Sequence, residues 1–368
     1  MDNRNGNINK AQLLSCLKQV RDQLHDQAPL IHCITHPIVV NDCANAVLAL
    51  GGRPIMAEHP AEVADISASA AALTVSLGNI TDARAESMLL AGKAIKRMKD
   101  AENTKRASVI DLVGITCSPF RMELAKRFIK ECKPAVIKGN GSEIRAIAGA
   151  AFHGTGVDVS AADAVTAKDP DTVHSMAHIA RKLAEETGAV ILVTGEVDII
   201  ASPNKDTTYG IYNGSPNMAK VTGTGCMLTC ITGAYLAVTD ALTACILAAI
   251  TLDCAGECDR DRAGGGDRRI ALRITAEQLE RIGSIRRDVE GDGEGLTGVF
   301  GDGTRFRGGR DLPILKNIDG DLLARAGKIA DGDSTDGAVA GGCEGAENVR
   351  VFQQHRRILD RGGERLRN

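Results

Sequence analysis

Residues 28–56 read APLIHCITHPIVVNDCANAVLALGGRPIM and contain one complete structural unit. The apolar, β-branched run from Ala28 to Ile34 predicts a strand, and the helical spacing of apolar residues from Ile38 to Leu50 predicts a helix. Gly51 and Gly52 end that helix, and the run from Arg53 to Met56 predicts a second strand. A helix of ten or more residues between two strands is typical of a right-handed βαβ unit with parallel strands.

The same alternation continues along the chain. Further strands are predicted at residues 71–77, 107–113, 135–137, 189–193 and 197–201, the last followed by a hairpin through Thr207 to Tyr212. Helices are predicted at residues 10–24, 82–99, 118–132, 142–150, 171–187, 226–238 and 241–258. This order predicts an α/β fold in which helices flank both faces of a mostly parallel central sheet.

Composition narrows the classes of function. The 368 residues carry 44 basic against 47 acidic side chains, so the chain has no field that would attract nucleic acid or an anionic membrane. Aromatic residues make up 2% and Trp is absent, which removes the stacking platforms that bases require. The longest apolar helical run, Ala241 to Leu252, is too short to span a bilayer. We therefore expect small-molecule chemistry, with no nucleic acid and no membrane as partner.

The cysteines point to a reducing compartment. There are 11 of them, scattered and odd in number, without a C-x-x-C pair. That distribution argues against a disulfide framework and against a structural zinc site. The first residues are polar and lack the apolar run of a signal peptide. The expected location is the cytoplasm.

Residues 221–230 read VTGTGCMLTC and join a glycine-rich turn to the start of an apolar helix. Glycine permits a tight turn, and the first helical N–H groups lack intrahelical partners, so such a junction suits an anion. Cys226 lies at this helix start, which biases its thiol toward thiolate; the alternative is a small buried cysteine. The chain lacks a Walker A motif, and the third dinucleotide-binding glycine is replaced by Leu228.

Polar or unusual residues follow six of the predicted strands, where α/β sheets bind ligands. They are His32, Thr35 and His36, Met56, Gly78 and Asn79, Asp111 and Gly114, Lys138 to Asn140, and Thr194 to Glu196. Three of them also have a structural interpretation: Met56 in the core, and His32 and His36 in the core or a loop.

Two further side chains allow two interpretations each. Arg121 lies in the first turn of the helix that Ser118 caps, where it opposes the helix dipole; it is either a solvated surface residue or a phosphate ligand. Glu143 either completes a capping box with Asn140 or, together with Asp111, provides the hard oxygen ligands that Mg²⁺ prefers beside substrate phosphates.

Several of these segments together resemble the hydroxyethylthiazole kinase family of the ribokinase-like superfamily, over about residues 14–258. They are Pro29 to Thr35, Asn41 to Asn45, Pro54 to Ala57, Asp111 to Gly114, Pro119 to Arg121, Lys138 to Ile144, Thr194 to Asp198 and Thr222 to Cys226. The resemblance implies a ribokinase-like fold and phosphorylation of the hydroxyl of 4-methyl-5-(2-hydroxyethyl)thiazole by Mg-ATP, a salvage step toward thiamine.

The resemblance also implies roles for individual residues. Met56 and Gly223 resemble thiazole-site residues, and Arg121 and Thr194 resemble ATP contacts. Cys226 occupies the position at which most ribokinase-like enzymes have an aspartate base. A homotrimer with sites between subunits is implied as well. The alternatives are a ribokinase-like kinase of another small alcohol and a catalytically silent nucleotide-binding protein.

The sequence departs from the family pattern near its C-terminus. Leu112 and Gly141 are minor departures, but residues 263–267 read AGGGD where the family has a Gly-x-Gly-x-Phe-like segment. Residues 261–368 hold 21 of the 40 glycines and 17 Arg against 2 Lys, whereas residues 1–260 hold 11 Arg and 14 Lys. We therefore predict a kinase domain over residues 1–258 and a weakly structured or frame-shifted extension over residues 259–368, with one short helix at 275–282.

Overall fold

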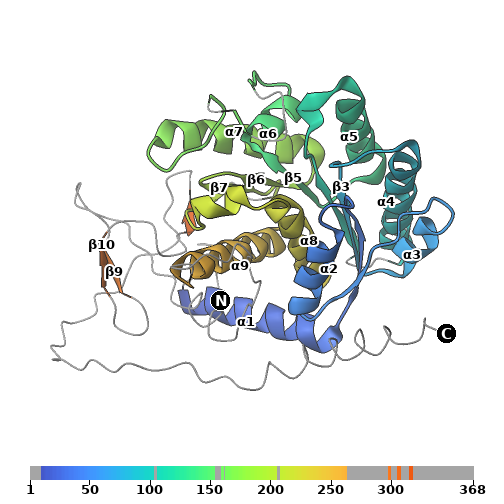
Figure 1. Cartoon of the computed structure of the whole chain (residues 1–368), viewed down its shortest axis with the longest axis horizontal. Helices are drawn as coiled ribbons and strands as arrows, with labels where there is room; N and C mark the ends of the chain where they lie inside the picture. Colours follow the sequence, from blue (N-terminus) through green and yellow to red (C-terminus); the bar gives the residue numbers. More distant parts are fainter. Residues whose placement is uncertain are drawn as a thin grey trace, which may run out of the picture. The chain divides into compact units, whose positions relative to one another are not determined.

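A central β-sheet organises the protein, which was analysed as a computed structural model (Figure 1). The structure describes residues 10–102, 106–153, 159–160, 162–204, 208–262, 297–299, 305–307 and 315–317. All of them belong to one unit, Met1–Ala326. The predicted helix at 275–282 lies outside the described residues, and the predicted boundary after residue 258 stays a prediction.

The sheet has the strand order β11-β8-β7-β6-β5-β4-β3-β1-β2. Its strands are β1 (Leu30–Ile34), β2 (Arg53–Ile55), β3 (Ala72–Ser76), β4 (Ala107–Asp111), β5 (Val136–Asn140), β6 (Val190–Thr194), β7 (Asp198–Ala201), β8 (Thr208–Ile211) and β11 (Leu315–Asn317). Neighbours from β2 to β6 pair in parallel, and the pairs β6–β7, β7–β8 and β8–β11 are antiparallel. Two further strands, β9 (Thr297–Val299) and β10 (Arg305–Arg307), form an antiparallel pair.

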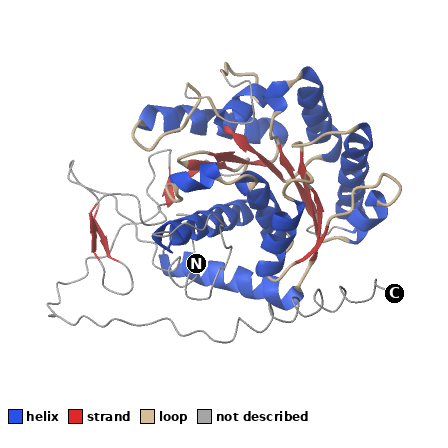
Figure 2. Cartoon of the chain, in the orientation of Figure 1, coloured by secondary structure: helices blue, strands red, loops and turns tan. Residues whose placement is uncertain are grey.

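Helices cover both faces of the sheet (Figure 2). One face carries α1 (Lys10–Gln27), α2 (Val40–Ala49), α8 (Thr224–Leu236) and α9 (Ala241–Arg262). The other carries α3 (Val63–Ser69), α4 (Asp82–Glu102), α5 (Pro119–Cys132), α6 (Gly141–Ile147) and α7 (Pro170–Thr187). Strand side chains alternate between the two resulting cores: Val109 and Val136 contribute to the first, and Ile110 and Ile137 to the second.

Helix α8 is buried on all sides because it lies between the sheet and its neighbours α2 and α9. A Cβ at Gly233 would collide with Cγ2 of Thr74 on β3, so this glycine lets the helix approach the strand closely. Helix α8 is therefore held against the middle of the sheet, and its first turn has a fixed position beside the strand ends.

Most predicted elements are present, with ends that shift by a few residues. The elements not predicted from the sequence are α3, the short 3-10 helices η1 (Ile115–Cys117) and η2 (Pro216–Lys220), and the strands β9, β10 and β11. Helix α3 has seven residues, which is too short for a helical period to be distinctive. None of the helices in the described part of the chain is long and apolar enough to cross a membrane.

Candidate active site

The site lies along the carboxyl edge of the sheet. Because β1 to β6 are parallel, residues that follow these strands meet at one edge, as the sequence analysis predicted. The first turn of α8 reaches the same edge. A Cβ at Gly223 would collide with Val39, which precedes α2, and Gly223 has a φ of 92°. A Cβ at Gly225 would lie 3.1 Å from Nζ of Lys138. Glycine at these positions therefore permits the close packing that builds the site.

Cys226 lies within this turn, and its side chain is buried. Its Sγ is 3.4 Å from Nε2 of His36 and 3.7 Å from Oγ of Ser76. Burial, and then the negative charge of Asp111, raise the pKa of the Cys226 thiol to about 12, although Lys138 and Ser76 act in the opposite direction. The expected bias toward thiolate is therefore wrong for this structure, because burial outweighs the helix end.

Asp111 is the centre of a buried polar group at the ends of β4 and β5. Its Oδ2 accepts from Nζ of Lys138 at 3.0 Å and from Oγ1 of Thr229 at 2.9 Å. Burial disfavours the Lys138 ammonium, but the charge of Asp111, the charge of Glu143 and the hydrogen bond to Asp111 act in the opposite direction, and the pKa of Lys138 is raised. Lys138 and Asp111 thus form a buried ion pair within the site.

Glu143 completes this group. Its Oε1 accepts from the Gly114 N–H at 2.7 Å, and its Oε2 accepts from the Asn140 N–H at 2.8 Å. Asn140 Oδ1 in turn accepts from the Glu143 N–H, so the predicted capping box is present. Burial, and then the charge of Asp111, raise the pKa of Glu143 to about 7. Two carboxylates thus repel each other across a buried space.

Arg121 is not a solvated surface residue. Its Nη1 donates to the carbonyls of Leu77 and Val113, the latter at 3.3 Å, and its Nη2 donates to Gly78 O at 2.9 Å. These carbonyls offset the conflict between the guanidinium and the positive end of α5. Ser118 caps that helix as predicted, accepting from the Arg121 N–H at 3.3 Å. Three of the five N–H donors are used, which leaves two for a ligand.

Met56 and Thr194 lie at the two ends of the edge. Thr194 ends β6, in register with Asn140, and is half-buried. Met56 follows β2 and packs against the core beside α8. Five strand spacings separate β6 from β2, or about 24 Å. Cys226 lies between these two ends, because it contacts His36 after β1 and Ser76 on β3.

His32 has a structural role. Its Nε2 donates to the carbonyl of Ala57 at 2.8 Å, which leaves Nδ1 to accept from Oγ of Ser67 at 2.7 Å. Burial lowers its pKa, so the neutral ring is favoured. His32 therefore fixes the segment after Met56 and is not free for chemistry.

Four residues without a role predicted from the sequence complete the site: His36, Ser76, Lys138 and Thr229. His36 and Lys138 were named only among the polar residues at strand ends, and Ser76 and Thr229 were not singled out. Signals were present for Lys138, a charged residue in the otherwise apolar strand β5, and for Thr229, which lies three residues after Cys226 on the same side of a helix. Ser76 gave no such signal.

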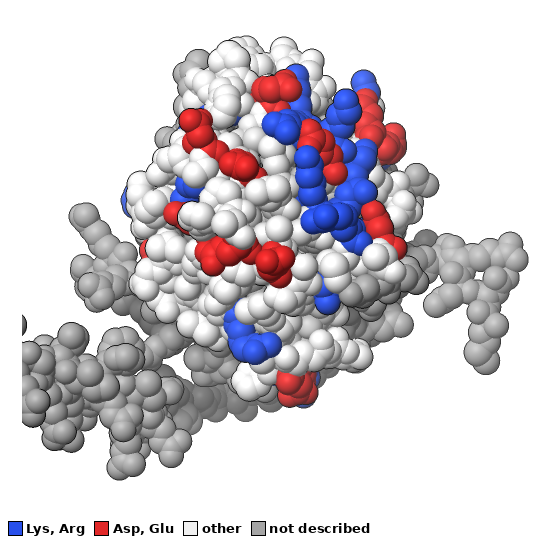
Figure 3. Space-filling view, turned by 90° about the vertical axis from the view of Figure 1, so that its right-hand side faces the viewer, with Lys and Arg blue, Asp and Glu red and all other residues white. Residues whose placement is uncertain are grey.

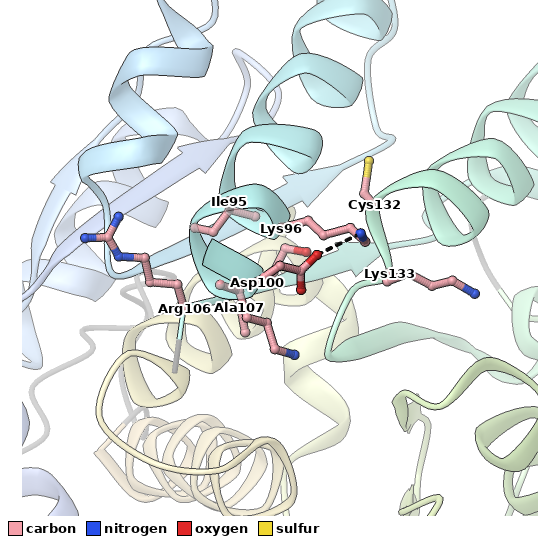
Figure 4. A pocket seen from close by; sticks show the side chains of 9 residues that line it. Ile95, Lys96, Asp100, Arg106, Ala107, Cys132 and Lys133 are labelled. Carbon is pink, nitrogen blue, oxygen red and sulfur yellow. Dashed lines mark hydrogen bonds and ion pairs between the residues drawn. The ribbon is translucent and has the colours of Figure 1, made fainter. Parts of the chain in front are cut away.

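A separate hollow lies at the opposite end of β4 (Figure 4). It measures about 50 Å³ and is lined by Ile95, Lys96, Lys99, Asp100, Arg106, Ala107, Ser108, Cys132 and Lys133. Lys96 forms an ion pair with Asp100 at 2.9 Å. Basic and acidic side chains lie side by side on the face drawn in Figure 3. On α4 and α5, Glu131 pairs with Lys93 and Arg127. This hollow contains none of the residues of the carboxyl edge.

The chemistry of the carboxyl edge suits phosphoryl transfer, which needs anion binding, charge neutralisation and a proton acceptor. The protein is thus of the class of α/β small-molecule kinases. The family model of the hydroxyethylthiazole kinase family matches residues 21–274, and the chain belongs to that family.

Individual relatives agree with this assignment. A hydroxyethylthiazole kinase 2 from Clostridium botulinum strain Hall is 45% identical over 254 residues, 69% of this chain and 92% of the relative. A hydroxyethylthiazole kinase from Desulfovibrio desulfuricans is 38% identical over 255 residues, 69% of this chain and 86% of the relative. The solved structure of the Pyrococcus horikoshii OT3 protein of that name matches with a TM-score of 0.60 and 26% identity, over 73% of this chain and 93% of that chain. The predicted α/β fold and the predicted hydroxyethylthiazole kinase activity are confirmed.

Proposed function

We propose that the carboxyl edge is where this kinase transfers the γ-phosphoryl group of ATP to the hydroxyl of 4-methyl-5-(2-hydroxyethyl)thiazole, with Cys226 accepting the hydroxyl proton. The observation that carries the proposal is the position of Cys226. Its thiol lies in the first turn of α8, beside the buried Asp111 group and between the Met56 and Thr194 ends of the edge. A group in that position would meet the hydroxyl of the alcohol where it attacks the phosphoryl group.

The remaining residues bind and orient. The free N–H groups of the first α8 turn suit the phosphate that is transferred, and the two unused donors of Arg121 suit the phosphates of ATP. Thr194 is proposed to contact the nucleotide at one end of the edge. Met56 and Gly223 are proposed to contact the thiazole ring at the other end.

Asp111 and Glu143 are proposed to hold Mg²⁺ directly or through its water shell. Their donor set fits this ion, because both are buried carboxylates and the charge of Asp111 raises the pKa of Glu143. No group of three His, Cys, Asp or Glu side chains suited to a metal occurs among the described residues, which fits an ion bound mainly by substrate phosphates and water. When bound, Mg²⁺ would neutralise charge on the transferred phosphoryl group.

The test is turnover by the full chain. We expect ADP and the thiazole phosphate to form in equal amounts when ATP, the thiazole alcohol and Mg²⁺ are all present. Excess EDTA should lower the rate at least about 100-fold, because the phosphate charge is then unneutralised. Equal rates with and without EDTA would contradict the proposed metal role, and ADP formation independent of the alcohol would contradict the proposed acceptor.

We also propose a homotrimer, supported by apolar side chains around α2. Ile38 is 77% exposed, Leu48 is 56% exposed and Val40 is also exposed. Exposed apolar side chains grouped beside a site are typical of a surface that a partner covers. A cytoplasmic location is proposed too, and the free state of eight cysteines in the described part of the chain supports it: Cys33, Cys43, Cys117, Cys132, Cys226, Cys230, Cys245 and Cys254.

Leu48→Glu should convert the trimer to monomers, because it places a charge in the proposed apolar interface. Sedimentation velocity measures the change. Phe152→Glu provides the control, because Phe152 is exposed and follows α6, which packs in the other core from α2. A parental chain that sediments as a monomer, or a Leu48→Glu variant that stays trimeric, would contradict the proposal.

A further inference from the structure

The imidazole of His36 lies directly against the thiol of Cys226. His36 follows β1, and its Nε2 is 3.4 Å from Sγ of Cys226 although 190 residues separate them. Gly78, which follows β3, makes room for the ring, since a Cβ there would collide with Cδ2 of His36. The backbone of His36 is fixed by its carbonyl, which accepts from the Val39 N–H at 3.1 Å. The contact is therefore built from three separate segments of the fold.

The second ring nitrogen distinguishes this histidine from His32. Nδ1 of His36 is buried and has no hydrogen-bond partner in the described part of the chain, whereas both ring nitrogens of His32 are satisfied. A buried polar atom without a partner costs about 1–3 kcal/mol. Packing therefore does not explain why position 36 is a histidine. The contact between its Nε2 and the Cys226 thiol does explain it.

A thiol at this site needs a neighbour that takes its proton. With a pKa of about 12, Cys226 is protonated at neutral pH and has no free capacity as a base. Burial, and then the charge of Arg84, lower the pKa of His36, while Asp111 acts against them. The imidazole is therefore neutral at pH 7 and able to accept a proton at one nitrogen.

The charged groups around His36 permit it to become charged for a short time. The positive charge of Arg84 on α4 disfavours the imidazolium. That charge is partly offset, because Arg84 forms an ion pair with Glu58 at 2.8 Å and donates a hydrogen bond to the Thr35 carbonyl. Asp111 on β4 favours the imidazolium. Cys226 on α8 would carry a negative charge once it has lost its proton. These opposite charges suit a proton that arrives during the reaction and then leaves.

We propose that His36 is a positioning residue that takes the proton of the Cys226 thiol at Nε2, so that Cys226 can take the proton of the substrate hydroxyl. The inference rests on the proposed base role of Cys226. In the balanced step, the alcohol oxygen forms a bond to the γ-phosphorus while the bond to ADP breaks. The hydroxyl proton passes to Sγ, the thiol proton passes to Nε2, and the imidazolium later releases it to water.

His36→Asn tests the pair, because asparagine keeps a polar side chain of similar reach but cannot take the proton. We expect kcat to fall about 10–100-fold while KM for ATP stays within about twofold. The parental kcat should be constant from pH 7 to 9.5 and decrease below the lowered pKa of His36, where the ring is already protonated. In His36→Asn, kcat should rise about tenfold per pH unit over pH 7 to 9.5, because the thiol then loses its proton to water.

The same substitution in a Cys226→Asp background separates a proton role from a structural one. A carboxylate needs no partner to take its proton, so His36→Asn should cost less than about threefold there. His178→Asn on α7 is the matched control, because His178 is exposed and should change neither kcat nor its pH dependence.

The outcomes separate the two proposals. An equal loss in both backgrounds, or a pH profile that His36→Asn leaves unchanged, would overturn the role of His36. An impaired Cys226→Ala together with a fully active His36→Asn would overturn the role of His36 and leave that of Cys226. A fully active Cys226→Ala would overturn both.

Discussion

Cys226→Ala should lower kcat by roughly 10²–10⁴-fold, the usual contribution of a positioned proton acceptor. KM for ATP should change little, because Cys226 is proposed to meet the alcohol and not the nucleotide. Steady-state kinetics with saturating Mg²⁺ measure both constants. Since Sγ contacts Ser76 and His36 within a buried region, thermal unfolding of the same variant shows whether lost packing contributes.

Two comparison variants make this result specific. Cys230→Ala removes a buried thiol one turn further along α8, where Sγ contacts Thr74, and should keep the parental kcat. Cys226→Asp should also keep activity, because a carboxylate beside Lys138 can accept the same proton. Cys226 would be only a structural residue if Cys226→Ala turned over at the parental rate.

The fold was predictable because its local signals agree with its topology. The run from Ala28 to Met56 specifies strand, helix and strand, and the rule for βαβ units then fixes parallel pairing and handedness. The units up to β6 repeat the parallel pattern, so the side of the sheet that carries the site follows as well. The short α3 was missed because seven residues between two strands show no distinctive period.

The sequence predicted the place of the site, at the ends of several strands, but not the contacts between its side chains. Asp111 and Lys138 lie on the neighbouring strands β4 and β5, so parallel pairing in register brings them together. The contact between His36 and Cys226 could not be predicted from the sequence, because it depends on how α8 packs against the sheet. The protonation state of Cys226 was predicted wrongly for a related reason. The sequence indicates a helix start, but burial depends on the packing of α2 and α9 around α8.

Glu143 shows why two interpretations of one motif need not exclude each other. The capping box with Asn140 is present, and the same carboxylate is buried beside the charge of Asp111. The hydrogen bonds from Gly114 and Asn140 orient the carboxylate, and orientation is what a proposed metal ligand requires. The capping box of α6 thus also orients the Glu143 carboxylate for its proposed role as a metal ligand.

Arg121→Ala should raise KM for ATP and reduce kcat/KM by ~2–3 kcal/mol, or about 30–150-fold, while KM for the thiazole alcohol stays close to parental. The reason is that Arg121 keeps two N–H donors beyond the three used on Leu77, Val113 and Gly78. Arg121→Lys keeps the charge but loses the planar fork, so it should recover only part of the loss.

The matched control for Arg121 lies on the same helix. Arg127 on α5 pairs with Glu131 at 2.7 Å at the surface, so Arg127→Ala should leave both KM values unchanged. The hydrogen bonds of Arg121 to three carbonyls also contribute to stability. Thermal unfolding measures that contribution separately from ATP binding. A structural role alone would lower the unfolding temperature and raise both KM values together. If Arg121 binds phosphate, Arg121→Ala should raise KM for ATP and leave KM for the thiazole alcohol unchanged. Unchanged ATP kinetics would contradict that role.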